Sequence, residues 1–260
     1  MNKLTYLNYH LKKGCLIRWP EKCFPLPIYI APCSFYSMND SDRYAYMNMA
    51  IEALNTWESV GGGTFSFVMT NSLNDSFLNI EWRRVDRKSL GNCSFNYDAD
   101  SRLYSAEVSI GISDGILHKK YMDDNEVYHT ILHEIGHALG LGHSPNPDDI
   151  MYTPHQYGKV NLSKRDIDSV RWLYNFPLGS SVESLNKTYS TNCNNIDDIV
   201  MNIVNGNTES KFQKTLNSIK NPQRDLEEEQ KKLAQMNKFQ LSIQNVKLPK
   251  ELADRFKDMS

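Results

Sequence analysis

The feature that most constrains this chain is the run His133-Glu134-Ile135-Gly136-His137-Ala138-Leu139-Gly140-Leu141-Gly142-His143. On a helix, His133 and His137 are one turn apart and share a face, so both imidazoles can reach a single metal ion while Glu134 stands beside them. Gly140 can adopt a positive φ and turn the chain sharply, so that His143 supplies a third nitrogen from another direction. Three protein ligands leave one position of a tetrahedral zinc ion for water, which is typical of zinc hydrolases.

The length of the motif decides how specific it is. H-E-x-x-H alone is a weak signal, whereas the added Gly140 and His143 make a chance match far rarer. The alternative is a buried amphipathic helix whose histidines are ordinary core residues, because apolar residues recur at helical spacing (Val127, Ile131, Leu132, Ile135, Leu139). The complete spacing favours the metal site. His129 lies one turn before His133 on the same face, but no ligand spacing requires it, so we interpret it as an ordinary residue.

The full motif followed by Met151 resembles the metzincin zinc endopeptidases, and Ser144 after the third histidine is similar to their matrixin branch, the matrix-metalloproteinase-like enzymes. The dipeptide Met151-Tyr152 and residues 162–174 are also similar to matrixins. The resemblance covers roughly residues 15–177. It implies a protein or peptide substrate.

The resemblance also implies roles for residues after the motif. Met151 and Tyr152 would form a turn beneath the metal, and Asp166 would tie the following helix to this turn. Residues near Pro154 and Tyr157 would form a wall of the main specificity pocket. Arg165 stands in place of the acid that captures a freed N-terminal ammonium in this family, so we do not expect activation through that salt bridge.

Periodic patterns predict the elements around the motif. Apolar residues recur every three or four positions in residues 42–59, which predicts an amphipathic helix. Alternating or apolar runs predict strands at 28–30, 65–69, 77–82, 90–97 and 104–112. A helix, several strands and then the metal-binding helix predict an α+β fold. The resemblance implies a metzincin-like catalytic domain, with a twisted mixed sheet, a backing helix, an active-site helix and residues 90–97 as the edge strand lining the cleft.

We divide the chain into an N-terminal segment (1–24), a matrixin-like zinc protease domain (25–177) and a helical, polar C-terminal extension (178–260). The N-terminal segment is polar and irregular. In the extension, apolar spacing predicts helices at 196–204 and 212–219. Residues 225–242 combine charge runs with apolar residues at helical spacing, for which a solvated helix or a partner-binding hairpin is the favoured interpretation. No chemistry can be assigned to the extension. Its helices are a candidate surface for binding a partner.

Composition excludes several classes of function. The formal charge of −2 over 260 residues gives no field that favours nucleic acid or an anionic membrane surface. No apolar run is long enough to span a bilayer. Residues 1–20 lack the apolar segment of a signal peptide, whereas the resembled family is typically secreted, so a cytoplasmic protein and one that has lost its leader both remain open. The five cysteines contain no C-x-x-C pair and favour scattered thiols, with a single bridge among the first three left open.

We predict one catalytic zinc ion. Between residues 87 and 113 there is no His-x-Asp grouping of the kind that holds a structural zinc in vertebrate matrixins. Asp98, Asp100 and Asp114 are candidate ligands for a cation such as calcium, but a solvated loop is the favoured interpretation.

The sequence therefore predicts a zinc-dependent endopeptidase. Zinc on His133, His137 and His143 would lower the pKa of its bound water from about 15.7 to about 7, and Glu134 would be the general base. One alternative is a catalytically idle zinc scaffold that binds partners through its C-terminal helices; an intact Glu134 argues against it. Another is a narrow metallo-aminopeptidase or amidase that uses the same site.

Overall fold

The computed structural model describes residues 3–33, 40–84, 90–112, 123–154, 156 and 158–206. All of them belong to the first of the two compact units into which the chain divides, Met1–Ile219. The predicted helix at 212–219 and the charged segment 225–242 lie outside the described residues, as do Asp114 and Tyr157.

Five strands form one mixed sheet in the order β2-β1-β3-β5-β4. The parallel strands are β1 (Leu26–Ile30), β2 (Phe67–Met69), β3 (Leu78–Arg84) and β5 (Leu103–Ile112), whereas β4 (Gly91–Tyr97) pairs antiparallel with β5. The alternation predicted for β5 is seen in Ala106, Val108 and Ile110, which are all buried. The predicted α+β fold, with a mixed sheet that ends in the strand at 90–97, is confirmed.

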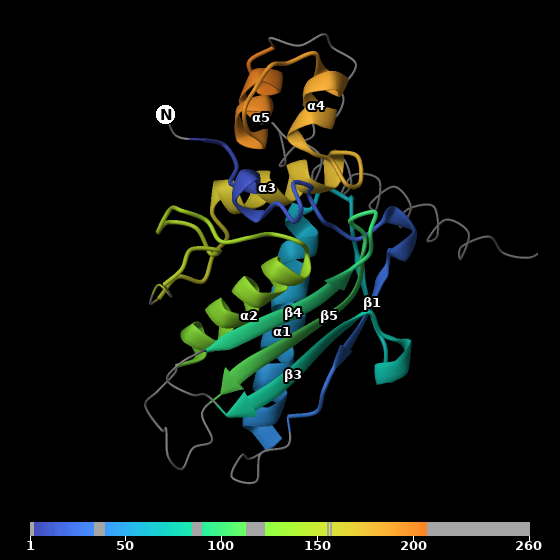
Figure 1. Cartoon of the computed structure of the whole chain (residues 1–260). Coiled ribbons are helices and arrows are strands. Elements are labelled where there is room, and N and C mark those ends of the chain that lie inside the picture. The colour runs from blue at the N-terminus through green and yellow to red at the C-terminus, as the bar shows by residue number, and fades with distance from the viewer. Residues whose placement is uncertain are drawn as a thin grey trace, which may run out of the picture. The chain divides into compact units, whose positions relative to one another are not determined.

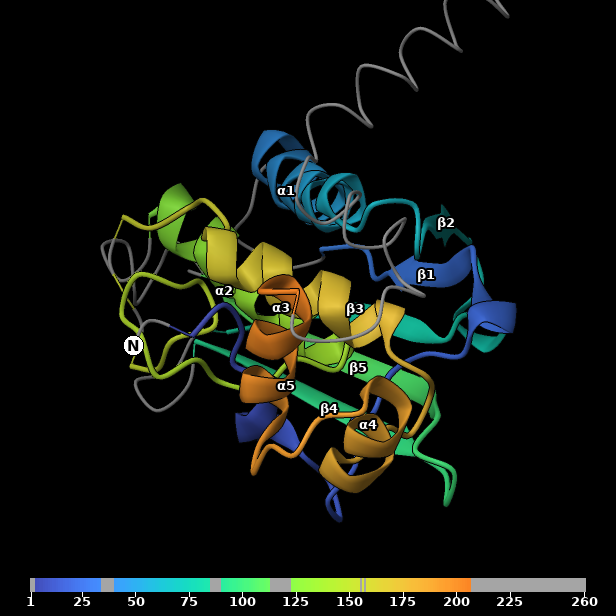
Figure 2. The same cartoon turned by 90° about the horizontal axis from the view of Figure 1, so that it is seen from above.

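Two long helices, α1 (Asp40–Val60) and α2 (Asp124–Ala138), lie side by side on one face of this sheet (Figures 1 and 2). Trp57 on α1 is fully buried, and its indole Nε1 donates to the carbonyl of Leu132 on α2 at 3.0 Å. α2 begins with a capping box, in which Asp123 and Glu126 each accept from the other's backbone N–H. These contacts fix the helix that carries the first two histidines of the motif.

Within the described residues, three shorter helices follow α2: α3 (Lys164–Asn175), α4 (Val182–Tyr189) and α5 (Ile196–Val204). The predicted helix at 196–204 is confirmed by α5. The sequence analysis missed α4, because only Leu185 and Tyr189 of that helix are buried and two apolar positions give little periodic signal. Its start is instead marked by a capping box at Ser181 and Ser184.

The N-terminal segment runs beside α3 and enters the core (Figure 1). Tyr6, Leu7, Ile17 and Trp19 are each at most 2% exposed. The indole Nε1 of Trp19 donates to the carbonyl of Ala138, the last residue of α2, at 2.8 Å. This segment contains the 3₁₀ helices η1 (Leu7–His10) and η2 (Glu21–Cys23), and a third, η3 (Leu73–Asp75), precedes β3. The segment that is polar and irregular in sequence therefore shares the core formed by the sheet and α2.

Two further observations concern the described residues alone. None of their helices combines the length and apolar character needed to cross a bilayer. All five cysteines lie within the described ranges, and no disulfide joins any of them.

Candidate metal centre

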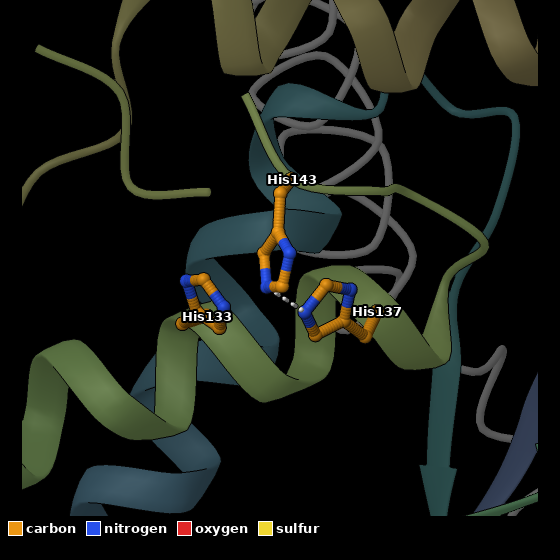
Figure 3. Close-up of side chains that lie close together, drawn as sticks. All are labelled: His133, His137 and His143. Carbon is orange, nitrogen blue, oxygen red and sulfur yellow. Dashed lines mark hydrogen bonds between the residues drawn. The ribbon is translucent and has the colours of Figure 1, made fainter. Parts of the chain in front are cut away.

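Helix α2 presents two imidazoles on one face, and the segment after it adds a third. The ring centroids of His133 and His137 are 4.8 Å apart, and the ring of His143 is 5.3 Å and 4.7 Å from them. Figure 3 shows the three rings pointing toward one another, two from the helix and one from the chain that returns above it. One nitrogen of each ring lies within 4.8 Å of the other two, so the three side chains form a candidate metal site.

The turn that returns the chain depends on Gly140. Its φ is +100°, a backbone conformation that residues with a side chain rarely adopt. A β-carbon at this position would also collide with the carbonyl oxygen of Ile17 from the N-terminal segment. Gly140 lies two residues after the last residue of α2. It therefore turns the chain sharply just beyond the helix, and His143 can face back toward α2.

Backbone carbonyls orient two of the imidazoles. His133 Nδ1 lies 2.8 Å from the carbonyl of Ile150, and His137 Nδ1 lies 2.8 Å from that of Leu141. A carbonyl only accepts, so each Nδ1 is the donor, and each Nε2 keeps a lone pair for a metal ion.

One nitrogen–nitrogen distance also fits zinc. His137 Nε2 is 3.2 Å from His143 Nε2. Nitrogens that lie about 2.0–2.1 Å from a tetrahedral zinc ion are separated by about 3.3 Å. The three imidazoles, the orientation of the two helical rings and this distance therefore suit zinc.

The electrostatic environment keeps these histidines neutral. Burial, aided by the neighbouring His137, lowers the pKa of His133 to about 3. Burial likewise lowers the pKa of His137 to about 4, and it lowers the pKa of His143. Neutral imidazole is the form that binds a metal ion, so at neutral pH none of the three has to lose a proton first.

Glu134 lies next to His133 and is only 6% exposed. Burial raises the pKa of this carboxyl to about 7, although the Arg83 guanidinium opposes the rise. Gly91 at the start of β4 lies so close to it that an added β-carbon would come within 2.6 Å of the Glu134 Oε1. Glu134 is therefore held between α2 and the edge strand, one residue after His133.

Met151 is fully buried beneath α2, and its backbone carbonyl accepts from the Ser144 N–H at 2.8 Å. Tyr152, the next residue, pairs with Ser144 in a single parallel β-bridge outside the sheet. The Asp166 carboxylate accepts from the Ile150 N–H at 2.8 Å and also caps α3. The turn that contains Met151 is thus fastened to both the His143 segment and α3.

The predicted wall of the specificity pocket is described only in part. Pro154 is exposed, whereas Tyr157 lies outside the described residues. His129, which we interpreted as ordinary, is 2% exposed and has its Nδ1 2.7 Å from the carbonyl of Lys159. It joins α2 to the chain that follows Pro154.

The two described aspartates proposed as cation ligands already have a cationic partner. The Arg102 guanidinium lies 2.9 Å from Asp100 and 3.9 Å from Asp98. Asp98 also accepts from the backbone N–H groups of Asp100 and Arg102. These contacts hold the loop together, and whether it binds calcium stays a prediction.

The sequence analysis missed several residues that shape the site. Gly136 lies between the two helical histidines, and the carbonyls of Leu141 and Ile150 orient their rings. The sequence did contain a signal for Gly136. Glycine inside a helix costs about 1 kcal/mol relative to alanine, so its presence there indicates that a neighbouring group packs closely against the helix. Backbone carbonyls carry no such signal in a sequence.

Comparison with known proteins adds independent information. A family model described as Matrixin matches residues 33–175. "Probable matrix metalloproteinase 095L" of Invertebrate iridescent virus 3 is 45% identical over 64 residues, which are 25% of this chain and 18% of that protein. "Interstitial collagenase" of Sus scrofa is 31% identical over 147 residues, which cover 53% of this chain and 29% of the relative. "Putative matrix metalloproteinase" of Trichoplusia ni ascovirus 2c is 28% identical over 163 residues, with coverages of 56% and 30%. The chain therefore spans less than a third of the length of each of these relatives.

Proposed function

The chain belongs to the matrixin family, and from that premise we propose that it is a zinc-dependent endopeptidase with Glu134 as its general base. The observation that carries the proposal is the convergence of His133, His137 and His143, whose nitrogens lie within 4.8 Å of one another. Glu134 follows His133 directly and is buried.

Each residue has a distinct task in this proposal. The three neutral imidazoles hold the zinc ion through Nε2, with their orientation set by the carbonyls of Ile150 and Leu141 for the two helical rings. A zinc ion supplies Lewis acidity for the scissile carbonyl and lowers the pKa of water. Glu134 accepts a proton from the attacking water and returns it to the amine that leaves. The backbone of Gly91, which has no side chain, packs against this carboxyl and leaves room for it.

The edge strand gives a site for an extended peptide. β4 is the last strand of the sheet among the described residues, so one of its edges faces no further strand of that sheet. Asn92, Ser94 and Asn96 are exposed and alternate with residues on the side of Glu134. An extended substrate can add to such an edge through backbone hydrogen bonds and run past the metal centre in both directions. This favours an endopeptidase over an aminopeptidase or amidase, whose substrates end at a closed pocket.

A direct test compares wild type, Glu134→Ala and Glu183→Ala on a library of quenched fluorescent peptides. Glu183 is exposed in the first turn of α4, so its variant is a control for loss of a carboxylate. We expect Glu134→Ala to retain zinc and to lose about 100-fold or more of its activity, as expected for a general base, and Glu183→Ala to match wild type. Unchanged turnover in Glu134→Ala would show that another group is the base. A wild type that binds zinc but cleaves no peptide would favour the idle scaffold.

A further inference from the structure

Residues 5–10, which we name the N-terminal brace, precede the part of the chain matched by the family model, residues 33–175. They nevertheless reach the metal centre at two places. One contact leads to His133 and the other to the loop that carries His143.

The first contact is a continuous path of hydrogen bonds. The Tyr6 hydroxyl donates to Asp166 Oδ1 at 2.8 Å. The other oxygen of Asp166 accepts from the Ile150 N–H at 2.8 Å, and the Ile150 carbonyl accepts from His133 Nδ1 at 2.8 Å. Tyr6 and Asp166 are 1% and 0% exposed, so water does not compete for their bond. Tyr6 therefore holds the Asp166 carboxylate in place. That carboxylate holds the backbone of Ile150, whose carbonyl orients His133.

The second contact is a packing contact. The His10 side chain lies so close to Gly142 that a β-carbon there would come within 2.6 Å of the His10 Cγ. Gly142 directly precedes His143, and the His10 ring centroid is 6.4 Å from that of His137. His10 therefore closes the space behind the loop that delivers the third imidazole.

The brace is anchored independently of these two contacts. The Tyr6 N–H donates to Ser169 Oγ at 3.2 Å. On either side, the Thr5 hydroxyl and the Leu7 N–H both donate to Asp197 Oδ1, at 2.6 Å and 2.9 Å. Helices α3 and α5 hold the backbone of residues 5–7. The aromatic ring of residue 6 should therefore stay in place even when the hydroxyl of Tyr6 is removed.

We propose that the N-terminal brace is part of the metal centre, with Tyr6 and His10 as positioning residues that slow the loss of zinc. Tyr6 acts on His133 through Asp166 and Ile150, and His10 restrains the loop of His143. The proposal rests on the proposed function only in that the three histidines hold zinc. In this proposal both residues act on the metal ligands through other groups.

The test uses the full chain loaded with zinc and measures the rate of zinc release to an excess of a chromogenic chelator. The variants are Tyr6→Phe, which loses one hydroxyl, His10→Ala, and the control Tyr9→Phe. Tyr9 lies in the same 3₁₀ turn but is 61% exposed. Loss of a group behind a metal ligand weakens metal binding by about 10–100-fold, and Tyr6 acts at one further step, so we expect zinc release to become about three- to tenfold faster in Tyr6→Phe. His10→Ala should show a similar increase, and Tyr9→Phe none.

The thermal midpoint of the zinc-free proteins separates positioning from general stability. A merely structural role would lower that midpoint and leave the rate of zinc release unchanged, which would overturn the proposal. Equal release rates in wild type, Tyr6→Phe and His10→Ala would also overturn it while leaving the proposed function intact. A wild type that binds no zinc would overturn both proposals. Should Tyr6→Phe fail to fold, His10→Ala tests the second contact by itself.

Discussion

Met151 lies against Gly136 so closely that its sulfur occupies the space that a β-carbon at position 136 would need. Gly136 stands between the two helical histidines, so this contact sets how near the methionine turn can approach α2. We predict that Gly136→Ala lowers the free energy of unfolding by up to about 2 kcal/mol, because overpacking costs about 1–3 kcal/mol against a gain of about 1 kcal/mol in helix propensity. Urea unfolding measures the change. A variant about 1 kcal/mol more stable than wild type would show that Met151 leaves room for a β-carbon at position 136.

Gly140 offers a second prediction, with a matched control in the same chain. Gly140 and Gly14 have φ values of +100° and +81°, but only Gly140 has a backbone oxygen, that of Ile17, where a β-carbon would stand. Alanine at either site costs about 1–2 kcal/mol for the left-handed backbone. Gly140→Ala should cost about 1–3 kcal/mol more for the collision, measured as the difference between the two variants in urea unfolding. Equal losses would show that Ile17 does not confine the turn.

Most of the fold could be predicted from local patterns. The five strands, α1, α2 and α5 appear where alternating or helical apolar spacing indicates them, because each of these elements buries one face. The burial of residues 5–7 and 16–19 could not be predicted in this way. Tyr6 and Trp19 pack against α3 and the end of α2, and partners so far apart in sequence leave no periodic signal.

In the candidate site, too, the positions of the histidines could be predicted from local sequence, whereas the groups that support them could not. The convergence of His133 and His137 follows from helical spacing, and the position of His143 follows from the glycine that ends the helix. The supports behind them are different, since Tyr6 and Asp166 are separated by 160 positions. Carbonyl groups such as that of Ile150 are present at every residue, so only coordinates show which of them orient a ring.

Asp197 gives a prediction for pH, at a distance from the metal ligands. Burial raises the pKa of its carboxyl above the ordinary 3.8, outweighing the hydrogen bonds from Thr5 and Leu7. The folded state then holds this proton at pH values where the unfolded chain has released it, so the group makes the free energy of unfolding fall as the pH rises above 3.8. Asp197→Asn cannot ionise and should lack this fall.

The measurement is a series of urea unfolding curves of both proteins from about pH 3.5 to about pH 6. The free energy of unfolding of Asp197→Asn minus that of wild type should increase along the series. A difference that stays constant or decreases would show that Asp197 ionises in the folded protein as easily as in the unfolded chain.

The most direct test of the whole account is the zinc content of the full chain, measured by plasma mass spectrometry after loading with zinc and exhaustive dialysis. Wild type should retain one zinc ion per chain, and His143→Ala, in which only two of the three imidazoles remain, should retain much less. A wild type that emerges from dialysis without zinc, or a His143→Ala variant that holds as much as wild type, would contradict a metal centre built from these three histidines.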